Sequence, residues 1–380
     1  MEIHDRQQLA SQLASGSLAH VVVQGLDLSD VDLSHVEVAG AVLLGCRLRD
    51  SVAVELLARG ALLFPALPQL PYNPYRPRLY HAAELMSGYR RGEHESYART
   101  LDQRIYQHYV ASRRKRPPAV LDTLAQRLHD HAIDDALADF LGRGEARKVI
   151  AIMGGHAMRR GEAAYADVAR IARAVARRDA HYLMTSGGGP GAMEATHLGA
   201  WLAGAPDNAL DEALALLAPA PDLAHTGWLD AAFEVRERWP DCAADSLGIP
   251  TWFYGHEPPN VFATHIAKYF SNSLREDGLL GIATHGVIYA PGSAGTIQEV
   301  FMDAAQNHYG TFELVSPMIF YGVKYWTETK PVYPLLENLA RGKQYADLLF
   351  ISDDVDEIVA RLVEHPPVPY SGQAPRPIGS

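Results

Sequence analysis

Apolar residues recur at every fifth position near the start of the chain. One register begins at Val23 and a second begins at Leu26. The first consists of Val23, Leu28, Leu33, Val38, Leu43 and Leu48, and the second of Leu26, Val31, Val36, Ala41 and Cys46. A period of five fits neither the helical period nor the two-residue alternation of a strand. Residues 1–64 are therefore predicted to form a small β-rich segment. The alternative is a chance run in an ordinary β-rich lobe.

This spacing resembles that of the pentapeptide-repeat family. The resemblance implies that short segments coil into a square, right-handed β-helix with the repeated apolar residue inside. The match covers about six repeats, and such repeats normally need stacked neighbours to bury their core. We therefore expect the segment to lean on the remainder of the protein or on another subunit, as an interaction or regulatory cap.

Residues 65–146 are predicted to be a proline-rich linker followed by a helical connector. The stretch 65–78 holds five prolines and two tyrosines, which leaves little capacity for a helix or a strand ladder. Helices are expected at 79–90, 95–110 and 120–141. A basic run at 113–116 is either a solvated helix end or a contact for an anionic effector or partner.

From residue 147 the pattern changes to short apolar runs that alternate with amphipathic ones. Buried strands are predicted at 149–153 and 181–185, each ending in a glycine turn, with a helix at 162–178 between them. This order is typical of an open, doubly wound α/β sheet that is mostly parallel. Further strands are expected at 251–254, 286–290, 318–321 and 348–352, helices at 261–275, 332–341 and 355–362, and a helical insertion at 205–245. This core, 147–365, precedes a loose tail at 366–380.

Composition limits the classes of partner. The formal net charge of −11 argues against nucleic acid or an anionic membrane as the main partner. The two cysteines, Cys46 and Cys242, cannot supply a disulfide framework or a four-cysteine zinc site. No secretory signal and no bilayer-spanning apolar run is found, so a reducing cytoplasm is the expected location.

The stretch 286–301 combines a buried strand, a turn of small residues and the start of a helix. The turn is expected to let backbone amides approach a ligand, and the helix expected from Thr296 adds unpaired amide donors and a partial positive charge. A phosphate is therefore expected there, with Glu299 within reach of the group that carries it. The alternative is a capping box, in which Glu299 only returns a hydrogen bond to the helix start at Thr296.

A second glycine turn, at 187–192, follows the second predicted strand. It formally fits the dinucleotide fingerprint G-x-G-x-x-A. That fingerprint belongs after the first strand, with an acidic residue about twenty positions further on. Neither condition holds, so NAD and FAD are not expected. The Walker pattern with its lysine is also missing from the sequence, which argues against ATP hydrolysis of that kind.

Together the two glycine turns closely resemble those of the LOG (Lonely Guy) family. That family carries a GGG loop ending in G-x-M and a second loop, P-G-G-x-G-T-x-x-E. This chain has GGGPGAME at 187–194 and PGSAGTIQE at 291–299. The first loop, the sequence EPPN at 257–260 and His285-Gly286 are most similar to the larger bacterial branch, the nucleotide 5′-monophosphate nucleosidases. The resemblance covers residues 147–363 and implies a Rossmann-like core.

The resemblance implies hydrolysis of the N-glycosidic bond of a nucleoside 5′-monophosphate, without a cofactor or a metal. It implies a catalytic pair of Glu299 and an arginine on the preceding helix, for which Arg275 is the candidate. A carboxylate there stabilises the oxocarbenium-like charge that cleavage builds on the sugar, or orients the water. The expected phosphate- and nucleotide-binding residues are Gly187, Gly188, Gly189, Gly191, Met193, Gly292, Ser293, Ala294, Gly295 and Thr296. Ser293 stands where the family has its second loop glycine, a departure that bears on specificity or activity.

Other functions stay open from the sequence. One is a binding protein that keeps the fold without hydrolysis, as a nucleotide sensor or as a carrier of a phosphate-bearing cofactor such as molybdenum cofactor. Another is an assembly protein built around the five-residue repeats. No lysine lies in a pyridoxal-phosphate motif, and His256 is more typical of a loop or core histidine than of a metal ligand. His265 and His285 are weaker candidates to line the site. A homodimer or larger oligomer is expected.

Overall fold

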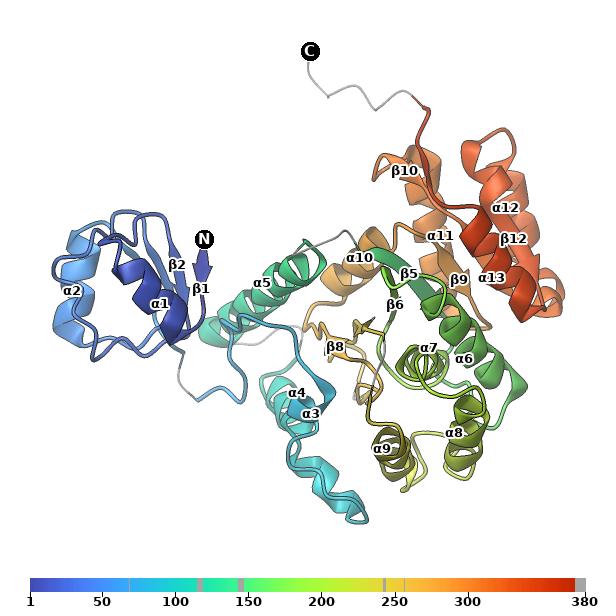
Figure 1. The fold of residues 1–380 in the computed structure, drawn as a ribbon, viewed down its shortest axis with the longest axis horizontal. Coiled ribbons are helices and arrows are strands. Elements are labelled where there is room, and N and C mark those ends of the chain that lie inside the picture. The colour runs from blue at the N-terminus through green and yellow to red at the C-terminus, as the bar shows by residue number, and fades with distance from the viewer. Residues whose placement is uncertain (68, 115–118, 143–146, 242–243, 256, 373–380) are drawn as a thin grey trace. The chain divides into compact units, whose positions relative to one another are not determined.

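The structure is a computed structural model that describes residues 1–67, 69–114, 119–142, 147–241, 244–255 and 257–372. Two compact units share the chain (Figure 1). The N-terminal unit consists of Met1–Leu79 and Arg104–Phe140, and the α/β unit of Tyr80–Gln103 and Leu141–Ser380. The segment 65–146, expected to be one connector, is thus divided between the two units.

Four short parallel strands form the sheet of the N-terminal unit, and each lies twenty residues after the one beside it. They are, in order across the sheet, β1 (Glu2–Ile3), β2 (Val22–Gln24), β3 (Val42–Leu44) and β4 (Leu62–Phe64). The register pairs Glu2 with Val22, Val22 with Val42 and Val42 with Leu62. Twenty residues equal four steps of the five-residue repeat, so equivalent positions of the repeat lie beside one another.

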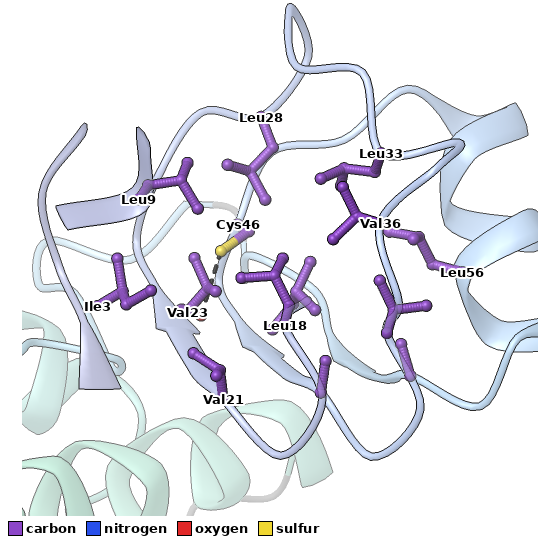
Figure 2. Close-up of a cluster of buried hydrophobic side chains, with 14 residues drawn as sticks. Ile3, Leu9, Leu18, Val21, Val23, Leu28, Leu33, Val36, Cys46 and Leu56 are labelled. Carbon is purple, nitrogen blue, oxygen red and sulfur yellow. Dashed lines mark hydrogen bonds between the residues drawn. The ribbon is translucent and has the colours of Figure 1, made fainter. Parts of the chain in front are cut away.

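Both five-residue registers contribute to the interior of this unit (Figure 2). Every member of the two registers is buried or partly buried. Leu9 of α1 (Arg6–Leu13) and Leu56 of α2 (Asp50–Ala58) belong to the same core. The Cys46 thiol donates to the Val23 carbonyl at 3.3 Å, and burial raises its pKa, so this cysteine is a core residue rather than a reactive one. Cys242 lies outside the described residues.

The segment between the two predicted domains contains less helix than expected. The helix predicted at 79–90 is reduced to α3 (Ala82–Leu85). Gly88 has a φ of 102°, and a Cβ there would lie 2.8 Å from the Arg99 carbonyl oxygen, so the chain turns instead. A 3₁₀ helix (His94–Arg99), α4 (Leu101–Ala111) and α5 (Val120–Gly142) follow. Arg113 and Arg114 of the basic run are exposed, and its other two residues lie outside the described ranges.

Seven strands, each parallel to its neighbours, form the sheet of the α/β unit. Its order is β12-β11-β9-β5-β6-β7-β8. The strands are β5 (Lys148–Met153), β6 (Tyr182–Ser186), β7 (Ser246–Gly248), β8 (His265–Ile266), β9 (Val287–Tyr289), β11 (Met318–Tyr321) and β12 (Leu349–Ser352). The chain runs outward from β5 to β8, then returns to β9 on the other side of β5. This is the predicted doubly wound topology, and its switch point lies between β5 and β9.

Helices flank this sheet in two groups (Figure 1). Helix α6 packs against α7 and α13, and α10 packs against α11. The predicted helical insertion contains α8 and α9, which pack against each other. The bounds are α6 (Ala163–Ala176), α7 (Ala192–Trp201), α8 (Ala209–Leu217), α9 (Trp228–Arg238), α10 (Asn272–Ile282), α11 (Ala294–Tyr309), α12 (Tyr333–Ala340) and α13 (Val355–Glu364). None of the helices in the described ranges is long and apolar enough to cross a membrane.

One part of the α/β unit differs from the prediction. Residues 251–254 contain one isolated bridge rather than a strand, and β7 ends earlier, at Gly248. The helix expected at 261–275 starts only at Asn272, because the edge strand β8 occupies part of this segment. Most side chains from 258 to 270 are buried, so no single apolar face marks the segment as helix or strand.

Part of the expected loose tail is a strand. Strand β13 (Val368–Pro369) pairs antiparallel with β10 (Leu314–Val315). Tyr370 packs against Gly310, where a Cβ would overlap its ring. The tail therefore has a packing partner at least as far as Tyr370, and residues 373–380 lie outside the described ranges.

Candidate functional site

A cavity of about 460 Å³ opens at the carboxyl ends of three strands. Its lining comes from 153–156 at the end of β5, from Gly187 and Met193 after β6, and from 293–296 and Glu299 after β9. Because the topology reverses between β5 and β9, this is the place where open α/β sheets bind their ligands. Both predicted glycine turns meet there.

The turn after β9 presents backbone amides to this cavity. Helix α11 begins at Ala294, two residues earlier than predicted, with Ser293 as its N-cap residue. The Ser293 side chain makes no capping hydrogen bond, and the first amides of a helix lack intrahelical acceptors. Thr296 lies inside the helix, so the alternative of a capping box between Thr296 and Glu299 is wrong. The helix start is open to an anion.

The serine that departs from the family pattern does not stand at a position that requires glycine. Ser293 has a φ of −110°, outside the left-handed region that favours glycine. The neighbouring Gly292 is the constrained position, since a Cβ there would overlap Thr296 Oγ1. Tyr325 donates its hydroxyl to the Gly292 carbonyl, which holds the turn in place. Ser293 therefore changes the chemistry of the turn and leaves its backbone intact.

The loop after β6 forms another wall of the cavity. Gly191 has a φ of 71°, and a Cβ there would overlap the Gly155 carbonyl oxygen, so only glycine fits at the start of α7. Ser186 Oγ accepts from the Gly188 amide at 3.1 Å and lies 2.9 Å from His197 Nε2. Both Ser186 and His197 are fully buried, and burial lowers the pKa of His197 to about 3. A neutral His197 thus supports the loop from beneath.

Arg275 and Glu299 form an ion pair in the cavity wall. Arg275 Nη1 lies 3.5 Å from Glu299 Oε1, and each side chain is 12% exposed. Arg275 Nε also donates to the Ile249 carbonyl at 3.0 Å. Arg275 Nη2 packs so closely on Gly187 that a Cβ there would overlap it. The guanidinium thus donates to Ile249 and packs against Gly187 while its Nη1 faces Glu299.

Burial raises the pKa of Glu299 to about 7. The Arg275 guanidinium acts in the opposite direction and offsets only part of this effect, while the carboxylate of Glu276 adds to it. A carboxyl group with a pKa near neutrality can take a proton from water and give it back at a pH near 7. Glu299 therefore has the properties of a general acid or base.

The cavity lining also includes side chains that were not expected there from the sequence. They include His156, Tyr254, Glu257 and Glu276. His156 directly follows the Gly-Gly pair at the end of β5, so the strand-end rule could have identified it. Glu276 was missed because the helix predicted at 261–275 ended one residue before it, whereas α10 continues to Ile282. Glu276 Oε2 accepts from Gln298 Nε2 at 2.8 Å, which places it beside the Glu299 helix.

The structure brings most of the predicted site residues together. Those that line the cavity are Gly187, Met193, Arg275, Ser293, Ala294, Gly295, Thr296 and Glu299. Gly188, Gly189, Gly191 and Gly292 lie in the same two turns without being part of the lining. His265 and His285 lie elsewhere in the α/β unit and are not part of the cavity lining. His256 lies outside the described ranges. Among the described residues, one group of three potential metal ligands exists, Glu2, His4 and Asp139, in the N-terminal unit.

Comparison with known proteins gives weak likenesses only. No protein-family model matches the chain, and no curated protein does. A molybdenum cofactor binding protein from Rippkaea orientalis is 12% identical, with a TM-score of 0.36 over 58% of this chain and 98% of the other. The molybdenum cofactor carrier protein from Chlamydomonas reinhardtii is 13% identical, with a TM-score of 0.37 over 58% and 99%. At this level the likenesses carry no argument about function, and the site must be judged by its own geometry.

Proposed function

We propose that this chain hydrolyses the N-glycosidic bond of a nucleoside 5′-monophosphate and releases the base and ribose 5-phosphate. The observation that carries the proposal is the buried pair of Glu299 and Arg275 beside the open start of α11. A carboxyl group with a pKa near 7 and a place for a phosphate then share one cavity. Both are needed for water to attack a phosphorylated sugar.

The 5′-phosphate binds, in this proposal, at the turn after β9. The open amides of residues 293–295 and the positive end of the α11 dipole favour an anion there. Burial of Gly292 and its hydrogen bond from Tyr325 keep the turn in one conformation before the ligand arrives. Such preorganisation lowers the entropy lost on binding.

The reaction breaks the bond between C1′ and a nitrogen of the base. The bonding electrons leave with that nitrogen, which takes up a proton, and the sugar passes through an oxocarbenium-like state. Ionised Glu299 takes a proton from the attacking water, whose oxygen bonds to C1′. Arg275 orients the carboxylate through their ion pair and favours its ionised form.

A second candidate is a protein that binds a nucleotide or a phosphate-bearing cofactor without hydrolysing it. One observation favours it: Arg275 already engages Glu299, and an ion-paired carboxylate is a weaker base than a free one. Molybdenum cofactor is one ligand of this class. The two resembling structures are named for it, but their TM-scores of 0.36 and 0.37 add no weight.

The two candidates are separated by one assay on the purified protein. Nucleoside 5′-monophosphates of each common base are incubated with it, and free base is measured by chromatography. The unphosphorylated nucleosides are assayed alongside. Hydrolysis predicts base release from the monophosphates, and much slower release from the nucleosides because the phosphate site stays empty. If no nucleotide releases its base while calorimetry detects binding, the second candidate replaces the first.

A further inference from the structure

The segment 257–263 borders the loop after β6, and its Glu257 lines the cavity, as does Tyr254. The segment is tied to that loop by Asn260, whose backbone amide donates to the Gly188 carbonyl at 2.9 Å. The Asn260 side chain donates to the Gly189 carbonyl at 3.2 Å. The segment is therefore fixed to the loop even though it lacks regular secondary structure.

A buried ion pair fixes the backbone at Glu257 itself. Lys268 Nζ lies 2.7 Å from Asp102 Oδ1, and both side chains are fully buried. The same ammonium donates to the Glu257 carbonyl oxygen at 3.1 Å, and Trp252 Nε1 donates to Asp102 at 3.0 Å. Because burying two charges is costly, such pairs are useful where they fix a geometry. Here the fixed element is the backbone that carries the Glu257 carboxylate.

Glu257 lies on the side of the cavity away from the proposed phosphate site. A Cβ on Gly189 would lie 3.3 Å from Glu257 Oε2, so the carboxylate sits over the loop after β6. The phosphate turn follows β9, and β5 separates the two strands. Neighbouring strands are about 4.8 Å apart, so the ends of β6 and β9 are about 10 Å apart. A nucleotide with its phosphate on the β9 turn and its sugar beside Glu299 would then extend its base toward the β6 side, where Glu257 lies.

The charged side chains of the cavity lining limit which nucleotide bases can bind favourably. Among the described lining residues there are three carboxylates, Glu257, Glu276 and Glu299, and one guanidinium, Arg275. Glu299 pairs with Arg275, and Glu276 accepts from Gln298 on the Glu299 helix. Glu257 is the carboxylate on the β6 side, and the Lys268 ammonium that donates to its backbone carbonyl also interacts with its charge. An ionised carboxylate only accepts hydrogen bonds, so it favours an amino group and repels a carbonyl oxygen in the same place.

We propose that Glu257 is a specificity-determining residue that accepts a hydrogen bond from the exocyclic amino group of the base. This inference rests on the proposed function, and it names the substrate class as nucleotides of amino-bearing bases. AMP is preferred over IMP, and CMP over UMP, because each pair differs by an amino group against an oxygen. A site built to receive a donor rejects an analogue that lacks it more strongly than an apolar pocket does.

The test compares kcat/KM for these two pairs in the wild type and in Glu257→Gln. The wild type is expected to favour the amino base at least about tenfold, as a hydrogen bond to a charged group allows. Glutamine both donates and accepts, so Glu257→Gln is expected to bring each ratio within about threefold of unity. The matched control is Asp277→Asn, which removes one negative charge from an exposed position of α10 outside the lining. An unchanged preference in Glu257→Gln overturns the proposal.

A binding measurement keeps this test separate from the question of hydrolysis. Dissociation constants of AMP and IMP are measured by calorimetry on Glu299→Gln, with and without Glu257→Gln. If the wild type hydrolyses no nucleotide, but AMP binds Glu299→Gln more tightly than IMP only when Glu257 is present, the specificity role stands and the hydrolase proposal fails. Equal affinities for AMP and IMP in both variants, or no binding of either, overturn the role of Glu257.

Discussion

Arg275 Nη1 and Glu299 Oε1 lie 3.5 Å apart, although the two residues belong to different helices, one before and one after β9 in the chain. Helix α10 carries the arginine and α11 carries the glutamate, and the two helices pack together. The pair is nearly buried, so the charge of one residue depends on the other and on the neighbouring Glu276. Because of this coupling, mutation of a neighbouring charged residue should change the pKa of Glu299.

Replacement of Glu276 by glutamine should lower the pKa of Glu299. The carboxylate of Glu276 raises that pKa, and the amide has no charge with which to do so. If Glu299 acts as the base, kcat/KM rises with pH through about 7 in the wild type, and Glu276→Gln moves this limb to lower pH by up to about one unit. A pH profile of base release measures the shift. Asp277→Asn serves as the control, and a limb that stays in place or moves upward contradicts the account.

Glu299 and Asp303 should each lower the folding stability as the pH rises from about 4 to about 7, against the opposite effect of buried histidines such as His197. Burial raises the pKa values of Glu299 and Asp303 to about 7, so the folded state holds protons that the unfolded state has released. Stability decreases with pH wherever the folded state binds more protons, and each group contributes a loss of roughly 3 kcal/mol across this window. Urea unfolding at a series of pH values checks the sign. The stability of Glu299→Gln relative to the wild type should increase as the pH rises from about 4 to about 7; a relative stability that decreases over this window would show that the sign is wrong.

Gly187→Ala should impair the site without unfolding the protein. The new Cβ overlaps Arg275 Nη2 and lies 2.6 Å from Met193 Sδ, and both are ends of flexible side chains that can move. Displacement of the guanidinium from Glu299 is expected to lower kcat by about 100-fold, a typical cost of misplacing a catalytic group. Thermal unfolding should change by only a few degrees. Gly278→Ala on α10, where a Cβ meets nothing within 4 Å, is the control for both measurements.

Variants of the Lys268–Asp102 pair should affect folding stability and base preference differently. Lys268→Met removes the ammonium from the fully buried pair and is expected to cost about 3–5 kcal/mol of unfolding free energy. The double variant with Asp102→Asn should regain most of that loss, because no buried carboxylate is left without its cation. It should not regain the preference for AMP over IMP, because the hydrogen bond from Lys268 to the Glu257 carbonyl is still missing. Recovery of both properties would mean that the pair is structural only.

Short sequence patterns correctly predicted several individual strands and the buried positions of the five-residue repeat. The strand at 318–321 coincides with β11, and the five-residue period correctly marked the buried positions of the N-terminal unit. The period did not show how many five-residue repeats separate one strand of the sheet from the next. The register of twenty residues between β2 and β3 depends on how the chain closes on itself, which no short window contains.

Tertiary contacts determined the parts that the sequence did not predict. Strand β8 exists because it pairs with β7, and its own residues have no strand-like alternation. Glu257 lies shortly before β8, and the buried ion pair that holds its backbone joins residues 166 positions apart in the chain. The proximity of Arg275 and Glu299 was likewise expected only from a family resemblance. Side chains that meet across helices leave no periodic signal in the sequence.

In the proposed reaction, Glu299 activates the water that hydrolyses a bound nucleotide. The most direct test is base release from AMP and CMP by the wild type and by Glu299→Gln at equal occupancy, with binding measured by calorimetry on the same samples. The account predicts release by the wild type, a loss of about 1,000-fold or more in the variant, and affinities that differ by less than about tenfold. Equal rates in the two proteins, or a wild type that binds these nucleotides and releases no base, would contradict it.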